Sequence, residues 1–295
     1  MELSLGTVQF GLDYGICGQK KPSTDYSVRC LELALDSGIT AFDTAEAYGN
    51  AQEIVGIFLK NKKSVRDKIF LSTKMLPNVL DEYQPNEYKR VIKERLTDSL
   101  RVLNTDYADA YIMHSARYAF RPEILEALAA VKEEGLAVKT GVSVYEPEEA
   151  KACFESECVD FIQLPYSVFD HRMKEAGVLD YNGSCEIHSR SAFIQGLITM
   201  NESEVPPFLA KAKPIVRRIG EISRDTGIDR VTLAMAYVKR ENAISHLVFG
   251  VDSAEQLEFD IEAFEQKVPS EILEMIENEF CGIDADIVMP SLWKK

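Results

Sequence analysis

The chain has 295 residues, of which 46% are hydrophobic, and its formal net charge is -15. An acidic surface argues against nucleic acid or an anionic membrane as a partner, because both would be repelled. No apolar run approaches the roughly 20 residues that cross a bilayer, and the N-terminal MELSLGTVQFG lacks the basic head and long apolar stretch of a signal peptide. We therefore expect a soluble, cytoplasmic protein.

Strand-like segments alternate with segments of helical periodicity along the chain. The strand-like segments are residues 3–10, 39–43, 69–74, 108–114, 137–143, 160–164, 184–189 and 245–250. Between them, apolar side chains recur at helical spacing, as in Val28, Leu31 and Leu35. Gly38 and Gly135 stand where a glycine would end a helix and release the chain into the next strand.

Eight strands alternating with helices predict an α/β fold of the (β/α)8 or TIM barrel type. A doubly wound open sheet is the alternative. The longest gap, between the seventh and eighth strands, contains helical stretches around residues 214–225 and 231–239. The length alone would allow two domains, but no Ser/Gly-rich linker divides the chain, so we expect residues 1–295 to form a single domain.

Four chemically active side chains follow the ends of three of these strands. Asp43 and Tyr48 lie in AFDTAEAYG, whereas Lys74 ends LSTK and His114 lies in YIMHS. The carboxyl ends of barrel strands converge on one face, so we expect these side chains to share one pocket.

A carboxylate, a phenol, an ammonium and an imidazole in one pocket can protonate an oxygen that gains negative charge. The reference pKa of tyrosine is near 10, and a neighbouring ammonium lowers it. We therefore expect Tyr48 to be the general acid, with Lys74 lowering its pKa and Asp43 holding Lys74 in place. His114 would donate a hydrogen bond to the substrate oxygen. None of these groups supplies electrons, so the chemistry requires a bound hydride donor.

The same motifs resemble those of the aldo-keto reductases. The likeness includes LGTVQFG, GITAFDTAEAYGNAQEIVG, LSTK, YIMHS and KTGVSV, and it runs from about Leu5 to the C-terminus. The resemblance implies a (β/α)8 barrel that binds NADPH or NADH without a Rossmann domain and reduces an aldehyde or ketone to an alcohol. It also implies that Asp43, Tyr48, Lys74 and His114 form the catalytic tetrad.

The resemblance further implies a set of cofactor-binding residues. Ser143 and Gln163 match positions that hold the nicotinamide carboxamide, and RSAFIQGL matches the segment beside the nicotinamide and pyrophosphate. FGVDSAEQLEFD matches the clamp around the adenosine phosphate. The full predicted set is Gly6, Thr7, Ser143, Gln163, Arg190, Ser191, Phe193, Gln195, Gly196, Gly250, Val251, Asp252, Ser253, Gln256 and Asp260.

This chain departs from the family pattern at the cofactor. Arg190 takes the place of an aromatic ring that often stacks on the nicotinamide, and a guanidinium plane can stack as well. Where the family commonly offers Lys or Arg to a 2′-phosphate, this chain has Val251, Asp252 and Gln256, with Asp260 in the usual asparagine place. Carboxylates would repel a phosphate but accept hydrogen bonds from a free ribose hydroxyl. We expect NADH to be used as well as NADPH, or in preference to it.

The expected partner is a small carbonyl compound, and the pattern does not set an oligomeric state. Tyr14, Tyr145, Tyr166 and Phe169 are candidate walls of the substrate pocket, which favours polar, sugar-like carbonyl compounds.

We expect no metal site. His171, His188 and His246 have no partner at metal-ligand spacing, and the six cysteines show no CxxC.

Two other functions use the same residues. A lysine at a strand end can form a Schiff base, so Lys74 would make the chain a lyase. A barrel that binds the cofactor without turnover would instead be a regulatory protein.

Overall fold

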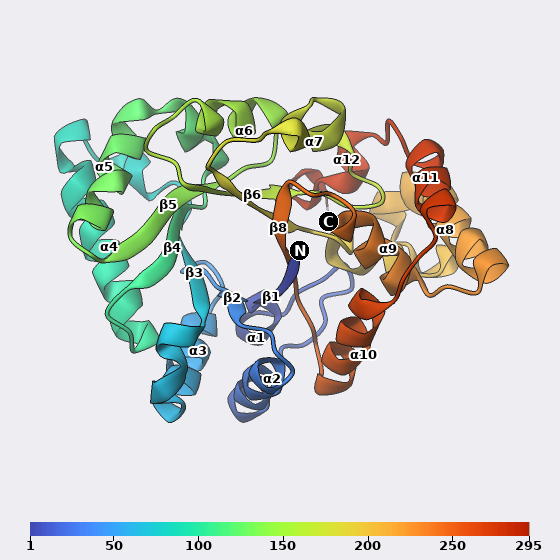
Figure 1. Ribbon diagram of the computed structural model, residues 1–295, viewed down its shortest axis with the longest axis horizontal. Coiled ribbons are helices and arrows are strands. Elements are labelled where there is room, and N and C mark those ends of the chain that lie inside the picture. The colour runs from blue at the N-terminus through green and yellow to red at the C-terminus, as the bar shows by residue number, and fades with distance from the viewer. Residues whose placement is uncertain (295) are drawn as a thin grey trace.

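The computed structural model describes residues 1–294, in which the strands close into a parallel barrel (Figure 1). The strands follow one another around the barrel in chain order, and β1 pairs with β8 to close it. They are β1 (Glu2–Gly6), β2 (Ala41–Asp43), β3 (Phe70–Met75), β4 (Ala108–Met113), β5 (Ala137–Ser143), β6 (Phe161–Pro165), β7 (Glu186–Arg190) and β8 (Ile244–Phe249). The predicted (β/α)8 barrel is confirmed, and the open sheet is excluded.

Helices surround the barrel on its outside (Figure 1). They are α1 (Val8–Gly11), α2 (Thr24–Asp36), α3 (Ala51–Asn61), α4 (Tyr88–Leu103), α5 (Pro122–Glu133), α6 (Pro147–Phe154), α7 (Arg172–Glu175), α8 (Lys213–Thr226), α9 (Arg230–Lys239), α10 (Ala254–Glu265), α11 (Ser270–Glu279) and α12 (Ala285–Val288). Both α8 and α9 lie between β7 and β8, where the sequence predicted two helical stretches.

Local signals at the helix ends explain several of these boundaries. Ser23 and Asp229 accept hydrogen bonds from the first backbone N–H groups of α2 and α9, which would otherwise lack partners. Gly38 and Gly135 follow α2 and α5 with φ of 89° and 72°. Glycine adopts this left-handed conformation without steric cost, so each helix ends where the sequence predicted.

The first strand is shorter than its sequence suggests. Residues 3–10 read as one strand, but β1 ends at Gly6 and the apolar residues that follow form the short helix α1. Both the backbone N–H and the hydroxyl of Thr7 donate to the carbonyl oxygen of Asp43, which turns the chain across the end of β2. At Gly11, a Cβ atom would lie 1.7 Å from the carbonyl oxygen of Tyr48. Glycine there lets α1 pack directly against the loop that carries Tyr48.

The lumen of the barrel contains a small apolar layer below the polar strand ends. Ala110, Ile112 and Phe161 form a cluster separate from the main core, with Phe70 packed against it. Alternation along a strand places Phe70 on the same side as Lys74, and Ile112 on the same side as His114. The strands therefore present apolar side chains to the lumen and polar side chains at its carboxyl-terminal rim.

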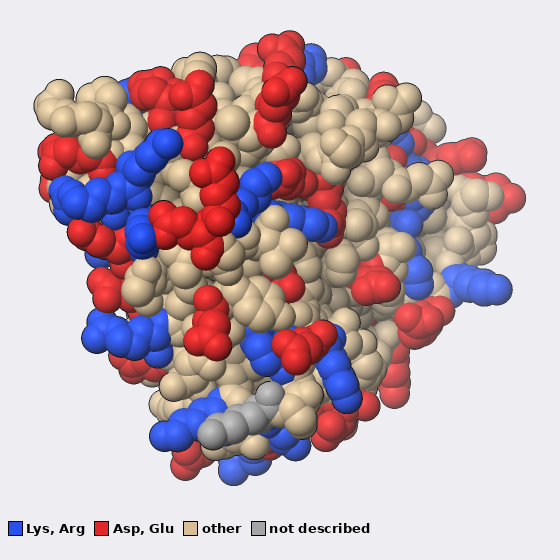
Figure 2. Space-filling view, turned by 60° about the vertical axis from the view of Figure 1, so that its left-hand side comes forward, with Lys and Arg blue, Asp and Glu red and all other residues tan. Residues whose placement is uncertain are grey.

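The surface carries both signs of charge. On the face drawn in Figure 2, basic side chains are interspersed with acidic ones, in a chain with 48 acidic and 33 basic residues. Within residues 1–294, no helix combines the length and apolar character needed to cross a membrane.

Candidate active site

A cavity of about 410 Å³ opens at the carboxyl ends of the strands. Asp43, Tyr48 and His114 lie in its wall, as the sequence predicted. Lys74 lies behind this wall and is completely buried. The structure therefore brings the four predicted side chains together, with Lys74 in contact with Asp43 rather than with the cavity.

An ion pair between Lys74 and Asp43 forms the base of the site. The Lys74 Nζ atom lies 2.5 Å from Asp43 Oδ2 and donates a second hydrogen bond to the carbonyl oxygen of Thr44 at 3.2 Å. The other carboxylate oxygen of Asp43 accepts from the Ser72 hydroxyl at 2.7 Å and from Gln163 Nε2 at 2.8 Å. Both oxygens of the buried carboxylate are therefore satisfied.

The hydrogen bonds and charges around Asp43 keep this carboxyl ionised. Burial by itself favours the neutral acid, but the Lys74 ammonium and the bonds from Gln163 and Ser72 hold the pKa of Asp43 below its usual value. Burial lowers the pKa of Lys74, and the Asp43 carboxylate opposes that shift. We therefore treat the two residues as a charged pair whose net charge is zero.

Tyr48 reaches the cavity from a turn just after β2. Its ring centroid lies 5.1 Å from Lys74 Nζ, and its ring meets that of His114 edge-on at 5.7 Å. Burial, reinforced by the Asp43 carboxylate, raises the pKa of Tyr48 above its usual value of 10. The expectation that Tyr48 has a lowered pKa is wrong, because burial and the Asp43 carboxylate outweigh the nearby ammonium. Tyr48 is a protonated phenol throughout the neutral pH range.

His114 is neutral in the same pH range. Burial lowers its pKa to about 3, with further contributions from the positive charges of Lys74 and Arg190. Its Nδ1 atom is buried and has no hydrogen-bond partner among residues 1–294. The ring can therefore donate one N–H to an oxygen placed in the cavity.

The cavity wall fits the carboxamide of a nicotinamide. Gln163 donates its Nε2 hydrogen to Asp43, and its Oε1 atom is buried without a partner in the described part of the chain. Ser143 lies in the same wall. An unpaired amide oxygen beside a hydroxyl offers an acceptor and a further donor or acceptor, which suits the NH₂ and C=O groups of a carboxamide.

Most of the predicted cofactor-binding residues lie in the cavity wall. These are Gly6, Ser143, Gln163, Arg190, Ser191, Phe193, Gln195, Gly196, Gly250, Asp252 and Gln256. Three residues of the segment after β7 have left-handed backbones although they are not glycine: Ser191 (φ 65°), Ile194 (φ 48°) and Gln195 (φ 55°). Such conformations cost free energy and concentrate where a backbone is shaped for a ligand.

Four predicted cofactor-binding residues do not lie in the wall. The Thr7 hydroxyl is fully buried and bonded to the carbonyl oxygen of Asp43. Val251 is fully buried, and Ser253 caps α10 by accepting from the N–H of Gln256. Asp260 is buried on α10. The sequence did not show which side chains of the clamp segment face the cavity.

Two of the four residues predicted for the substrate wall lie at the cavity. Tyr14 and Tyr145 lie in the cavity wall, and the Arg190 guanidinium lies 4.3 Å from the ring centroid of Tyr145. Tyr166 and Phe169 are buried in the core and are not wall residues.

Contacts with neighbouring side chains explain why Tyr166 and Phe169 are buried. The Tyr166 hydroxyl donates to Glu241 at 2.8 Å and its ring stacks on Tyr237, while Phe169 meets Phe280 edge-on.

Several wall residues were missed by the sequence analysis. They are Val8, Gln9, Gly15, Gln19, Ala192, Ile194, Thr199, Val231, Val248 and Phe249. Val8 and Gln9 lie within the LGTVQFG motif, so the motif could have identified them as wall residues. Val231 comes from α9, whose position across the cavity depends on the long connection between β7 and β8.

The model of the Aldo/keto reductase family matches residues 2–278. The chain belongs to this family. Aldo-keto reductases are oxidoreductases that act on small carbonyl compounds and in general use NAD(P)H.

Relatives of the chain are oxidoreductases. It is 26% identical over 309 residues to the oxidoreductase YrpG of Bacillus subtilis (strain 168), an alignment that covers 95% of this chain and 92% of the relative. It is 25% identical over 269 residues to L-glyceraldehyde 3-phosphate reductase of Escherichia coli (strain K12), covering 79% and 77%. The holo form of the aldo-keto reductase AKR11C1 from Bacillus halodurans superposes with a TM-score of 0.75 at 24% identity, covering 94% and 91%. At that identity the superposition shows the shared fold.

The buried carboxyl group of Asp260 should make the stability of the fold depend on pH. Neither carboxylate oxygen of this buried residue has a hydrogen-bond partner among residues 1–294, and burial, reinforced by Asp229, raises its pKa to about 7. The folded state therefore resists ionisation, and stability falls as the pH rises from about 4 to 7, by up to about 4 kcal/mol. Asp260→Asn should raise the Tm by several degrees at pH 8 and change it little at pH 4, as measured by thermal unfolding. An equal shift at both pH values would show that Asp260 does not titrate in this way.

Proposed function

We propose that this protein reduces an aldehyde or ketone to an alcohol with NADPH or NADH, with Tyr48 as the general acid. The observation that carries the proposal is the contact between the Tyr48 and His114 rings in the cavity wall, above the buried pair of Lys74 and Asp43. In the proposed reaction these two neutral donors would hold the carbonyl oxygen between them.

The residues of the site have separate tasks in the proposed reaction. The Tyr48 hydroxyl and the N–H of His114 bind the carbonyl oxygen and orient it. A nicotinamide cofactor, when bound in the cavity, would supply the hydride. As negative charge develops on the carbonyl oxygen, Tyr48 donates its proton, because an alkoxide is a stronger base than a phenolate. The Lys74 ammonium stabilises the phenolate that remains, and Asp43 holds the ammonium in place.

The residues that would hold the cofactor are distributed along the same cavity. Ser143 and Gln163 would bind the carboxamide, and the strained segment around Gln195 would lie along the pyrophosphate. Asp252 and Gln256 would face the adenosine ribose, where an acidic side chain suits a free 2′-hydroxyl.

A Schiff-base lyase is disfavoured by the position of Lys74. A lysine nucleophile must reach the carbonyl carbon as a free amine. Lys74 is completely buried, and its Nζ atom is bonded to Asp43 and to the carbonyl oxygen of Thr44. A regulatory role without turnover would leave the paired donors of Tyr48 and His114 without a task.

Removing the Tyr48 hydroxyl tests the assigned acid. Tyr48→Phe should lower kcat/KM for carbonyl reduction by roughly 10²–10⁴-fold, because the proton donor is lost. The dissociation constant of the cofactor should stay within about twofold, since the ring that lines the cavity remains. Steady-state kinetics and fluorescence titration measure the two quantities.

Tyr107→Phe is the matched control for this variant. It removes a hydroxyl from the residue just before β4, and kcat/KM should be unchanged. Turnover by Tyr48→Phe at the wild-type rate would end the assignment of Tyr48 as the acid.

The acidic clamp predicts the cofactor preference. NADH should bind at least as tightly as NADPH, because the Asp252 carboxylate in the cavity wall would repel a 2′-phosphate. Asp252→Lys should tighten NADPH binding roughly tenfold relative to NADH. Dissociation constants for both cofactors provide the measurement.

Asp225→Lys makes the same charge change at an exposed position on α8 and should leave the ratio of the two constants unchanged. A wild-type preference for NADPH greater than tenfold would contradict the proposed role of Asp252.

A further inference from the structure

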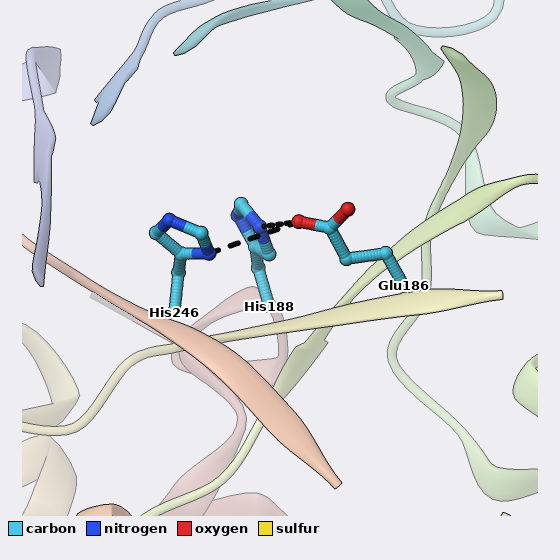
Figure 3. Close-up of side chains that lie close together, drawn as sticks. All are labelled: Glu186, His188 and His246. Atoms are coloured by element: carbon cyan, nitrogen blue, oxygen red, sulfur yellow. Dashed lines mark hydrogen bonds and ion pairs between the residues drawn. The ribbon is translucent and has the colours of Figure 1, made fainter. Parts of the chain in front are cut away.

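A carboxylate and two imidazoles that the proposed reaction does not use lie together between β7 and β8. Glu186 and His188 project from β7, and His246 projects from β8 (Figure 3). One ligand atom from each residue lies within 4.8 Å of the other two. Figure 3 shows the two imidazole rings side by side, with the Glu186 carboxylate directed at His188.

An irregularity in the pairing of β7 with β8 brings the imidazoles together. Ile187 pairs with Ile244, but His188 pairs with His246, so Ser245 is an extra residue on β8. With regular pairing, His188 would lie opposite Ser245. The bulge instead sets the two rings 4.2 Å apart between centroids. Bulges in sheets often re-aim a side chain in this way.

Glu186 Oε1 is the point on which the other polar atoms converge. It lies 2.8 Å from His188 Nε2 and 3.7 Å from His246 Nδ1. In a tetrahedral zinc site with bonds of about 2.1 Å, two ligand atoms lie about 3.4 Å apart. The two separations from Glu186 Oε1 bracket that value, and the ligand atoms of the three residues all lie within 4.8 Å of one another, so side-chain adjustments would place them around one cation.

The groups around the cluster match the surroundings of a metal site. Lys139 pairs with the other carboxylate oxygen of Glu186, which leaves Oε1 to face the imidazoles. Glu2 Oε2 lies 3.5 Å from His246 Nε2, the nitrogen that faces away from Glu186. Carboxylates commonly hold the second nitrogen of a metal-bound histidine.

A single hydrogen bond, from Nε2 to Glu186, leaves the other ring nitrogen of the buried His188 unpaired within the described part of the chain. The inside of a barrel is ordinarily filled by branched apolar side chains, and Phe161 and Phe70 pack against this ring at 4.4 Å and 5.3 Å between centroids. His188 is almost completely buried, and its Nδ1 atom has no partner among the described residues. A buried polar atom without a partner costs free energy, so an apolar residue would pack here at lower cost.

We propose that Glu186, His188 and His246 bind a divalent cation of the zinc class, with water as the fourth ligand. Two imidazoles and one carboxylate suit zinc rather than magnesium or calcium, which prefer oxygen ligands. The side chains of Glu186 and His246 are 20% and 15% exposed, which gives the ion access from solvent. The metal ties β7 to β8 and has a structural role, because Glu186 is the first residue of β7 and the cavity opens at the other end of the strand.

The proposed site differs from the expectation drawn from the sequence, which was that no metal binds. Glu186 and His188 are separated by one residue, but His246 follows 58 positions later, as the register partner of His188. The contact depends on a bulge that no spacing in the sequence reveals.

Zinc titration of the full chain tests the proposal. The background carries Cys17→Ser and Cys281→Ser, because those two cysteines are exposed and their thiols would bind zinc themselves. After removal of metals with a chelator, calorimetry with ZnCl₂ should show one equivalent bound. The Tm should rise by about 5 °C at a hundredfold excess over the dissociation constant, and MgCl₂ should not raise it.

Two variants test whether zinc binds at this cluster. Glu186→Gln and His246→Gln should each weaken zinc binding at least tenfold, whereas Glu133→Gln, at an exposed position on α5, should not. Glu186→Gln also removes the ion pair with Lys139 and could fail to fold, which circular dichroism would show. In that case His246→Gln alone provides the test. These readouts do not depend on carbonyl reduction.

Two outcomes would overturn the proposal. One is a Tm that zinc does not raise above its value in magnesium. The other is a zinc affinity that the folded His246→Gln variant retains. Anomalous scattering from a zinc-soaked crystal, with its peak between β7 and β8, would support it directly.

Discussion

The buried ion pair between Lys74 and Asp43 is the interaction on which the rest of the site depends. Two charges removed from water are costly unless each is paired and hydrogen-bonded. Here the carboxylate of Asp43 accepts from Lys74, Ser72 and Gln163, and its backbone carbonyl accepts twice from Thr7. One residue thus connects the ends of β1, β2, β3 and β6 and fixes the base of the cavity.

Burial sets the protonation state of the two groups above this pair. Burial, together with the Asp43 carboxylate, raises the pKa of Tyr48 and keeps the phenol protonated. Burial likewise keeps His114 neutral. Two neutral donors can hold a carbonyl oxygen without a counter-ion, and negative charge appears there only as the reaction proceeds. An ammonium 5.1 Å from the Tyr48 ring then faces a charge that was absent in the ground state, which is the condition for stabilising a transition state.

The parts of this protein that the sequence predicted are those governed by local pattern. Strand ends of a parallel barrel converge, so residues at the ends of β2, β3 and β4 were expected to meet, and they do. Contacts between distant segments were not predictable. Tyr166 and Phe169 follow a strand end, as true wall residues do, yet Glu241 and Phe280 draw them into the core.

Two further differences have the same origin. The direction of the pKa shift of Tyr48 depends first on its burial and then on its distances to Asp43 and Lys74, which the sequence does not give. The pairing of His188 with His246 depends on one extra residue in β8. The apolar residues of the first strand also continue into α1, so the sequence pattern did not show that β1 ends at Gly6.

A double-mutant cycle on the ion pair tests the central claim most directly, by denaturant unfolding of Asp43→Asn, Lys74→Met and the double variant. Each single change leaves one charge buried without its partner and should lower the free energy of unfolding by about 3–5 kcal/mol. The account predicts that the double variant is more stable than either single variant, because no unpaired charge remains. If the two losses simply add, the pair does not organise the site.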